Sequence, residues 1–214
     1  MSRSNRKKFE EMKSFSNVLE WDGQDTREKV KEIINQYNKV ILELACGKGE
    51  YSLHLGNKYR DTLIIGIDIQ GERLWRGAKD ALDNRLDNVY FLRIQIENLL
   101  EYIPKGSIDE IWITFPDPFP KDRDSKKRLT SPKFLEMYKV ILKKSGIVHL
   151  KTDSEELYEY TLEIIKSMDF NIIENIEDVY SRGDIENITD VQTTFEKKHI
   201  NEQKVIKYIK WKMN

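Results

Sequence analysis

The sequence predicts an α/β fold built around a mostly parallel β-sheet. Short apolar segments rich in Val, Ile and Leu alternate along the chain with segments whose apolar residues recur at helical spacing. This alternation is typical of βαβ units, in which neighbouring strands run parallel. The 214 residues are enough for one such domain with a full hydrophobic core but would be cramped for two.

Seven segments are expected to form strands. Five of them are separated by helical segments and cover residues 40–45, 63–68, 89–94, 108–114 and 146–151. The last two, 170–179 and 205–211, have no obvious helix between them, so we expect an antiparallel end to the sheet. The expected sheet therefore has seven strands and is mostly parallel, with an antiparallel last strand.

Helices are expected after most of these strands. They cover about residues 50–59 and 73–86, a segment that starts at Pro132, and a segment from Leu157 to Met168. Proline directly after Ser131 suits the first position of a helix. Ligands of such sheets bind beyond the carboxyl ends of the strands, so the residues that follow each strand are the candidates for a site.

The composition predicts a soluble cytoplasmic protein. Charged residues make up 34% of the chain, and no apolar run approaches the ~20 residues that a membrane span needs. The basic N-terminus is not followed by an apolar segment, as a secretory signal would be. The single cysteine, Cys46, excludes an internal disulfide and fits a reducing compartment.

The net charge of −1 hides a polarised distribution. Residues 1–8 carry four bases and no acid, and residues 121–128 carry five bases and two acids. Residues 153–190 carry twelve acids and two bases. Local patches decide whether a polyanion binds, so RNA remains a possible partner. We expect residues 1–20 to be a basic arm outside the core and residues 21–214 to be the domain.

The loop after the first strand predicts a nucleotide-type cofactor site. Gly47 and Gly49 allow a tight turn and a close approach to a ligand, and Asp68 ends the next strand where a carboxylate can accept ribose hydroxyls. Glu43 inside the strand suits a cationic ligand better than a pyrophosphate. Taken alone, the glycines also suit a plain turn or an NAD site, and Asp68 also suits a helix cap.

The segment Phe115–Lys121, which follows the fourth strand, predicts a base-binding site. Its three prolines fix a stiff backbone path, which would hold Asp117 in place. A carboxylate there can accept hydrogen bonds from N1–H and N2–H₂ of guanine. The basic run that follows offers contacts to phosphates. The competing interpretation is that the prolines only end the strand and the charges form a solvated loop.

These motifs together resemble the bacterial tRNA (guanine-N7-)-methyltransferase family over nearly the whole chain. The resemblance rests on three blocks, which are Pro116–Lys121 followed by Arg123 and Lys126–Arg128, then His149–Asp153, and then Thr193–Glu196 followed by Lys198. The chain departs from the family at Phe119, where tryptophan is usual. It also has Ala45 at the position of a common glycine and Gln95 at that of an aspartate near the adenine. We expect Ala45 to be small enough to cause little loss.

The resemblance implies a class I, Rossmann-like fold that uses S-adenosylmethionine to methylate N7 of a variable-loop guanine in tRNA, conventionally position 46. Asp117 would be the catalytic residue, stabilising the charge that develops on the purine. The cofactor-binding residues would be Glu43, Gly47, Gly49, Asp68, Gln95 and Asp117. The tRNA-binding residues would be Lys121, Arg123, Lys126, Lys127, Arg128, Asp153, Thr193, Thr194, Phe195 and Glu196. No metal ion is expected, and the chain could be a monomer or a homodimer.

Three other functions remain open at this point. Methyltransferases that act on exocyclic amines of nucleobases or on protein amides use an Asp/Asn-Pro-Pro-aromatic turn in the same place. Here Phe119 follows Pro118 directly, without a second proline. An NAD-dependent oxidoreductase would explain the glycine loop. An RNA-binding module that holds the cofactor without catalysis would explain the basic run.

Overall fold

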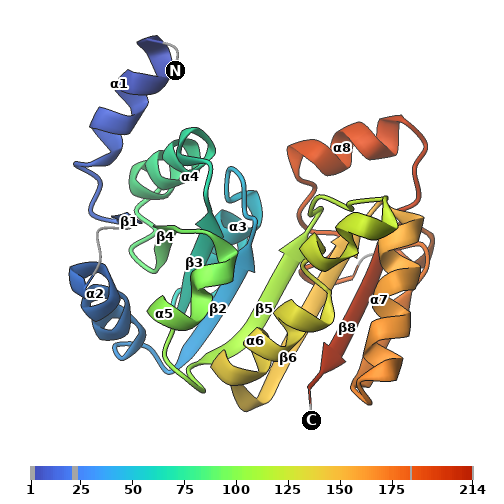
Figure 1. Cartoon of the computed structure of the whole chain (residues 1–214). Coiled ribbons are helices and arrows are strands. Elements are labelled where there is room, and N and C mark those ends of the chain that lie inside the picture. Colours follow the sequence, from blue (N-terminus) through green and yellow to red (C-terminus); the bar gives the residue numbers. More distant parts are fainter. Residues whose placement is uncertain (1–2, 21–23, 184, 214) are drawn as a thin grey trace.

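The computed structural model describes residues 3–20, 24–183 and 185–213, and within these residues eight strands form one sheet in the order β1-β4-β3-β2-β5-β6-β8-β7 (Figure 1). The strands are β1 Val18–Glu20, β2 Lys39–Leu44, β3 Thr62–Asp68, β4 Val89–Arg93, β5 Ile108–Thr114, β6 Leu142–Thr152, β7 Asn171–Ile176 and β8 Lys207–Lys212. The α-helices are α1 Arg3–Met12, α2 Gln24–Ile34, α3 Glu50–Lys58, α4 Gly71–Asp83, α5 Leu99–Tyr102, α6 Pro132–Ile141, α7 Glu155–Ser167 and α8 Thr194–Asn201. Short 3₁₀ turns are η1 Ile96–Asn98, η2 Asp122–Lys127 and η3 Tyr180–Arg182.

The mostly parallel α/β architecture is confirmed, but the expected strand count of seven is wrong. The additional strand, β1, pairs parallel with β4 at one edge of the sheet. With three residues it is too short to show a periodic apolar pattern. The last strand of the chain, β8, runs antiparallel to both β6 and β7, which confirms the expected antiparallel last strand.

The structure has a helix, α8, between β7 and β8, where the sequence showed no obvious one. Helices are recognised from an apolar stripe that faces the core. The residue that α8 buries is Glu196, which is polar, so the stripe is missing from the sequence. Thr193 begins the helix as its N-cap, its Oγ1 accepting a hydrogen bond from Glu196 N at 3.1 Å.

The first twenty residues, which we expected to lie outside the core, contribute Met12 and Leu19 to it. Helix α1 packs against α4, where the Trp75 indole N–H donates to Glu11 at 3.1 Å. Residues 1–2, 21–23, 184 and 214 lie outside the described part, as do the side chains of Arg3, Ser4, Asn5 and Gln24. The expected boundary between arm and domain therefore falls at undescribed residues.

Two apolar cores lie on opposite faces of the sheet. One core joins the sheet to α2, α5, α6 and α7, and the other joins it to α1, α3, α4 and the segment 176–191. Neighbouring residues of one strand point to opposite cores, as Ile41 and Leu42 do. Because β2 to β6 run parallel, their carboxyl ends lie along the same edge of the sheet (Figure 1). Across the described residues no helix is long and apolar enough to cross a membrane.

Candidate functional site

Two adjacent cavities lie at the carboxyl edge of the sheet. One has a volume of about 420 Å³ and extends over Asp68 and Gln95, and the other has about 350 Å³ and extends over Glu43 and Gly47. The two cavities share four lining residues, which are Ala45, Arg73, Phe115 and Asp117. The structure therefore brings the glycine loop and the proline-rich segment to the same place, as the sequence predicts.

The turn after β2 requires its two glycines. Gly47 and Gly49 have φ angles of +57° and +66°, in the left-handed region that other residues rarely adopt. A Cβ on Gly49 would also lie 2.4 Å from the Phe91 ring. Ala45 has φ +53°, so our expectation that alanine causes little loss there needs correction. A non-glycine residue in this conformation costs about 1–2 kcal/mol.

Asp68 connects the glycine loop to helix α4. Its Oδ2 accepts from the Gly47 N–H at 2.9 Å, and its Oδ1 accepts from the Gln70 N–H at 2.8 Å. Gln70 is the N-cap residue of α4, so the carboxylate does serve the start of that helix. Because each carboxylate oxygen has a second acceptor position, Asp68 can still accept hydrogen bonds from ribose hydroxyls in the cavity that it lines.

Glu43 lies at the base of the second cavity and is 1% exposed. Its Oε2 accepts from Ser52 N at 2.8 Å and Ser52 Oγ at 2.6 Å, and its Oε1 accepts from Thr114 Oγ1 at 3.0 Å. Burial raises the pKa of the Glu43 carboxyl to about 7, against the lowering effect of these bonds. A cationic ligand in this cavity would stabilise the ionised form, so the arrangement suits a sulfonium or an ammonium.

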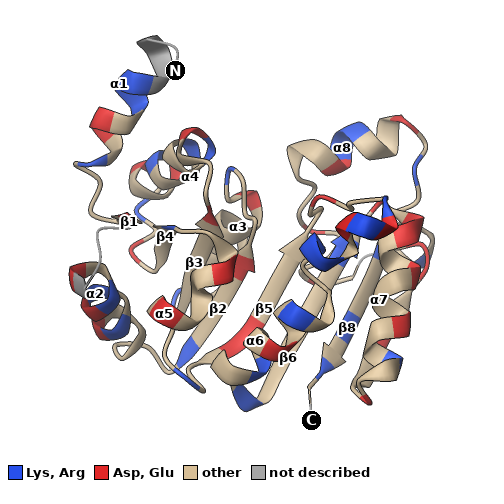
Figure 2. Cartoon of the chain, in the orientation of Figure 1, with Lys and Arg blue, Asp and Glu red and all other residues tan. Residues whose placement is uncertain are grey.

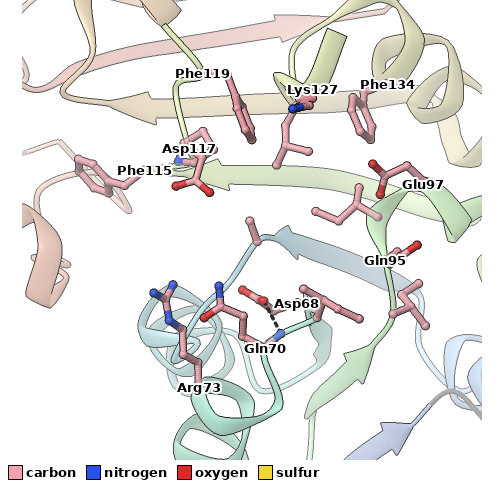
Figure 3. A pocket seen from close by; sticks show the side chains of 16 residues that line it. Asp68, Gln70, Arg73, Gln95, Glu97, Phe115, Asp117, Phe119, Lys127 and Phe134 are labelled. Carbon is pink, nitrogen blue, oxygen red and sulfur yellow. Dashed lines mark hydrogen bonds between the residues drawn. The ribbon is translucent and has the colours of Figure 1, made fainter. Parts of the chain in front are cut away.

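Gln95 lies exposed at the other end of the first cavity, directly before η1. Glu97, two residues later, lines the same cavity, and Figure 3 shows both side chains at this end of it. A carboxylate is therefore present in this cavity two residues after the position at which the family resemblance expects one. Glu97 could not be identified from the sequence, because the resemblance concerns position 95 alone.

Asp117 is held in a strained loop between the two cavities. The residues on either side of it, Phe115 and Phe119, have φ angles of +48° and +45°. Such conformations persist where surrounding contacts impose them, and they cluster at functional sites. Among the described residues the Asp117 carboxylate has no hydrogen-bond or ion-pair partner, and Figure 3 shows it pointing into the cavity. It is thus free to bind a ligand.

Arg128 binds backbone carbonyls of this loop and so stabilises it. This finding corrects the expectation that Arg128 binds the tRNA backbone. The side chain is 3% exposed and donates to the Phe119 carbonyl at 3.0 Å and the Pro118 carbonyl at 3.1 Å. It also forms an ion pair with Glu156 at 2.8 Å and lies over the Tyr160 ring at 4.4 Å. Because the guanidinium is enclosed by these partners, it is not available to a phosphate.

The other four predicted basic residues remain exposed. They are Lys121, Arg123, Lys126 and Lys127. Lys127 lines the first cavity, pairs with Asp124 at 2.8 Å and lies over the Phe119 ring at 5.8 Å. In Figure 2 the ribbon between β5 and α6, which includes η2, is blue at its Lys and Arg positions and lies near the upper end of α7. They therefore form a cationic surface beside the Asp117 loop.

The Thr193–Glu196 block lies against the second cavity, but its members differ in accessibility. Thr194 donates its N–H and its hydroxyl to the Glu50 carboxylate, at 2.8 and 2.5 Å, which ties α8 to the start of α3. Phe195 is 52% exposed and lines the cavity. Glu196 is fully buried, so a direct contact of this carboxylate with RNA, which we expected, is wrong for the structure described.

Glu196 instead forms a buried ion pair with Lys151, whose side chain is also fully buried. The Lys151 ammonium also donates to the Ile188 carbonyl and to the Tyr51 hydroxyl. Burial lowers the pKa of Lys151, and the neighbouring Glu196 carboxylate opposes that shift. The end of β6 and helix α8 are joined through this pair. In the sequence, Lys151 is marked only as a member of the His149–Asp153 block.

Asp153, a predicted substrate-binding residue, faces α8. Its Oδ2 lies 3.0 Å from Lys204 Nζ and 3.2 Å from His199 Nδ1. The His199 ring in turn stacks on Phe115, with ring centroids 5.9 Å apart. The N-cap of α7 is the next residue, Ser154, whose Oγ accepts a hydrogen bond from Leu157 N at 3.2 Å.

Arg73 is a further lining residue that the sequence analysis missed. It lies in the first turn of α4, and both cavities include it. A single arginine in the first turn of a helix belongs to no sequence motif, so the residues around Arg73 do not indicate a role in a site. Among the described residues no group of three or more His, Cys, Asp or Glu side chains is placed to hold a metal ion.

Comparisons with known sequences identify methyltransferases. A family model described as "Putative methyltransferase" matches residues 37–209. A tRNA (guanine-N(7)-)-methyltransferase of Christiangramia forsetii is 40% identical and aligns over 99% of this chain and 99% of its own. The enzyme of that name from Bacteroides thetaiotaomicron is 36% identical over 100% of this chain and 87% of its own.

Solved structures share the fold at low sequence identity. A 30S ribosomal A1408 methyltransferase from an uncultured bacterium superposes with a TM-score of 0.61 at 20% identity, over 88% of this chain and 94% of that one. A SAM dependent methyltransferase from Aquifex aeolicus gives a TM-score of 0.57 at 16% identity, over 99% and 98% of the two chains. At these identities the likeness shows the fold alone.

Proposed function

Because the chain belongs to the tRNA (guanine-N7-)-methyltransferase family, we propose that it transfers the methyl group of S-adenosylmethionine to N7 of a guanine in tRNA. The observation that carries this assignment is the free carboxylate of Asp117, which faces the boundary between the two cavities from a loop held by Arg128. The NAD-dependent oxidoreductase that the glycine loop left open has no support from the comparisons.

The two cavities fit the two ends of S-adenosylmethionine. The first offers Asp68 for the ribose hydroxyls and Gln95 with Glu97 for the adenine amine. In the second cavity, Glu43 would lie near the positively charged end of the cofactor. The turn at Gly47 would let the backbone approach the cofactor closely. Asp117 and Ala45 line both cavities, so the reactive centre would lie beside them.

For this reaction the protein has to position the two reactants and to stabilise the charge that develops. The cofactor, when bound, supplies an electrophilic methyl group on a sulfonium. Guanine N7 has a free lone pair, so no base has to remove a proton before attack. Of the described residues that line the two cavities, none is a histidine. Transfer would break the sulfur–carbon bond and make the N7–carbon bond, which would move positive charge onto the purine. Asp117 would stabilise that charge and would accept from N1–H and N2–H₂.

The RNA would approach over the cationic surface of η2. Lys121, Arg123 and Lys126 are exposed beside the Asp117 loop and would contact phosphates. Lys127 would first have to exchange its bond to Asp124. We place the target guanine in the variable loop, at the conventional position 46, and the enzyme in the cytoplasm with its tRNA substrate.

The assignment is tested with isotope-labelled S-adenosylmethionine and an unmodified tRNA transcript that has guanine at position 46. Digestion to nucleosides should yield labelled N7-methylguanosine, and a transcript with adenine at position 46 should yield none. A product methylated on an exocyclic amine would favour the competing class of methyltransferase, and tRNA binding without turnover would favour a binding module.

Asp117→Asn tests the catalytic role separately from binding. The amide keeps the size of the side chain but loses the charge, so methyl transfer should fall by at least about 100-fold. Cofactor affinity, measured by calorimetry, should change far less because the remaining lining residues are intact. Near-normal turnover of this variant would remove Asp117 from the mechanism.

A further inference from the structure

Arg73 projects from the first turn of α4 into the region where the cavities meet. It lines both cavities of the candidate site and also a third, of about 780 Å³, that opens over Lys8 and Trp75. Its Cδ lies 3.9 Å from where a Cβ on Gly47 would be, so its stem covers the open side of the glycine turn. In Figure 3 its guanidinium points toward the loop that carries Asp117.

The guanidinium of Arg73 has no carboxylate partner among the described residues. The guanidinium carbon lies 6.0 Å from the centre of the exposed Phe195 ring. Asp117 lines the same two cavities but forms no ion pair with Arg73. The other acids of the second cavity have hydrogen-bond partners. Glu50 binds Thr194, and Glu43 binds Ser52 at the cavity base. Arg73 is therefore an exposed positive charge whose stem lies against the glycine turn and whose guanidinium is free to bind an anion.

The surroundings favour an anion at this point. Helices α3 and α4 begin here, at Glu50 and Gly71, and helix N-termini carry partial positive charge. The planar guanidinium can form two parallel hydrogen bonds to a carboxylate. The methyl donor carries one carboxylate, on its amino-acid end. With the ribose at Asp68 and the sulfonium near Glu43, that end would lie in the cavity that Arg73 closes.

We propose that Arg73 binds the carboxylate of the methyl donor and, with Phe195, closes the amino-acid end of the cofactor site. The inference depends on the identity of the cofactor and not on which base is methylated. Phosphate binding by the same guanidinium is the competing interpretation. We favour the carboxylate because Arg73, although exposed, packs on Gly47 and lines the cavity of Glu43, whereas the basic residues of η2 do not line that cavity.

The test compares two ligands that differ only in the carboxylate, S-adenosylmethionine and its decarboxylated analogue. Dissociation constants are measured by calorimetry, without RNA, for the wild type, Arg73→Gln, Lys48→Gln and Arg76→Gln. Lys48 is the other cation that lines the second cavity. Arg76 is the matched control, because it lies one turn further along α4 and is paired with Asp80 at 2.9 Å.

The wild type should bind S-adenosylmethionine at least about tenfold more tightly than the analogue, as expected for a charge-assisted bond. Arg73→Gln should remove this preference by weakening only the natural cofactor, while Arg76→Gln should retain it. Equal weakening of both ligands, or a preference lost in Lys48→Gln but kept in Arg73→Gln, would overturn the assignment.

Two further outcomes separate this inference from the proposed function. An unchanged cofactor affinity of Arg73→Gln, combined with a raised KM for tRNA, would assign Arg73 to a phosphate and contradict the inference alone. Failure of the wild type to bind S-adenosylmethionine at all would contradict both. Circular dichroism and the melting temperature of each variant establish that it is folded before binding is measured.

Discussion

The Nζ atom of Lys151 lies 2.6 Å from Oε1 of Glu196, and both side chains are fully buried. Further hydrogen bonds offset part of the cost of burying two charges: Tyr180 donates to Glu196 Oε1, and Ile188 and Tyr51 accept from Lys151. Glu196 Oε2 has no hydrogen-bond partner among the described residues. The pair joins β6 to α8, which carries Thr194 and Phe195 over the cofactor cavity. Through this buried ion pair, Glu196 fixes the position of α8 relative to the sheet.

Lys151→Met should lower the free energy of unfolding by about 3–5 kcal/mol, because it leaves the Glu196 carboxylate buried without its counter-charge. Urea denaturation measures this change. Hydrogen exchange should also become faster in residues 187–201, which the pair holds. Glu196→Gln is a milder second variant in case the first does not fold.

Lys198→Met is the matched control for this prediction. Lys198 lies on α8, as Glu196 does, but its side chain is 68% exposed and lies 3.7 Å from Glu202. Its effect should stay below about 0.5 kcal/mol. Similar losses of unfolding free energy in the two variants would show that the buried pair stabilises the fold no more than an exposed pair does.

The raised pKa of Glu43 predicts that the ligand-free protein loses stability as the pH rises. Burial raises this pKa from 4.5 to about 7, so the folded protein holds a proton that the unfolded chain releases. The unfolding free energy should therefore fall between about pH 4.5 and 7, by on the order of 3 kcal/mol from this group. Denaturation of Glu43→Gln across the same range should lack this component.

The same carboxyl predicts that cofactor affinity rises with pH. A cationic ligand favours ionised Glu43, so S-adenosylmethionine should bind several-fold more tightly at pH 7.5 than at pH 6. In Glu43→Gln the affinity should follow only the titration of the cofactor itself. An identical pH profile for the two proteins would contradict a contact between Glu43 and the positive end of the cofactor.

Arg123 and Arg128 should respond differently to neutralisation, although both belong to the basic run. Arg123→Gln should reduce the slope of log affinity for tRNA against log salt by roughly one, as for a lost phosphate contact. Arg128→Gln should leave the slope unchanged and lower the unfolding free energy by about 1–3 kcal/mol, because it removes bonds to the Asp117 loop. A reduced slope for Arg128→Gln would restore its expected role in RNA binding.

Glu97→Gln should weaken S-adenosylmethionine binding more than Gln95→Ala, because a carboxylate accepts a stronger hydrogen bond from the adenine amine than an amide does. We expect a loss of about three- to tenfold, measured by calorimetry. The analogue with hypoxanthine in place of adenine lacks that amine, so its affinity should be insensitive to Glu97→Gln. Equal losses for both ligands would exclude this contact.

Most of the sheet could be predicted because its strands are buried on both faces. Such strands form continuous apolar runs, as residues 63–68 do, and the order of strands and helices then favours a parallel sheet. Strand β1 and helix α8 could not be predicted in the same way. The strand has three residues, and the buried residue of the helix is a glutamate, so neither has an apolar pattern.

The residue types of the candidate site were predictable, but their accessibility was not. Gly47, Gly49 and Asp68 have the expected turn and strand-end positions because local backbone conformation depends on nearby residues. Arg128 and Glu196 look like surface charges in the sequence, and their partners are 28 and 45 residues away along the chain, at Glu156 and Lys151. Arg73 and Glu97 have no local signal at all.

The sequence by itself therefore determined the α/β fold, the glycine turn and the proline-framed Asp117. The fold depends on the order of apolar and helical segments along the chain, and the two loops depend on their own glycines and prolines. Only the tertiary structure decided which charged residues face a ligand and which support the fold. The reason is that the burial of a charge depends on what packs around it, and residues far apart in the chain provide that packing. Asp117 lines the cavities without a partner while Glu196 is enclosed, although both are single acids in short motifs.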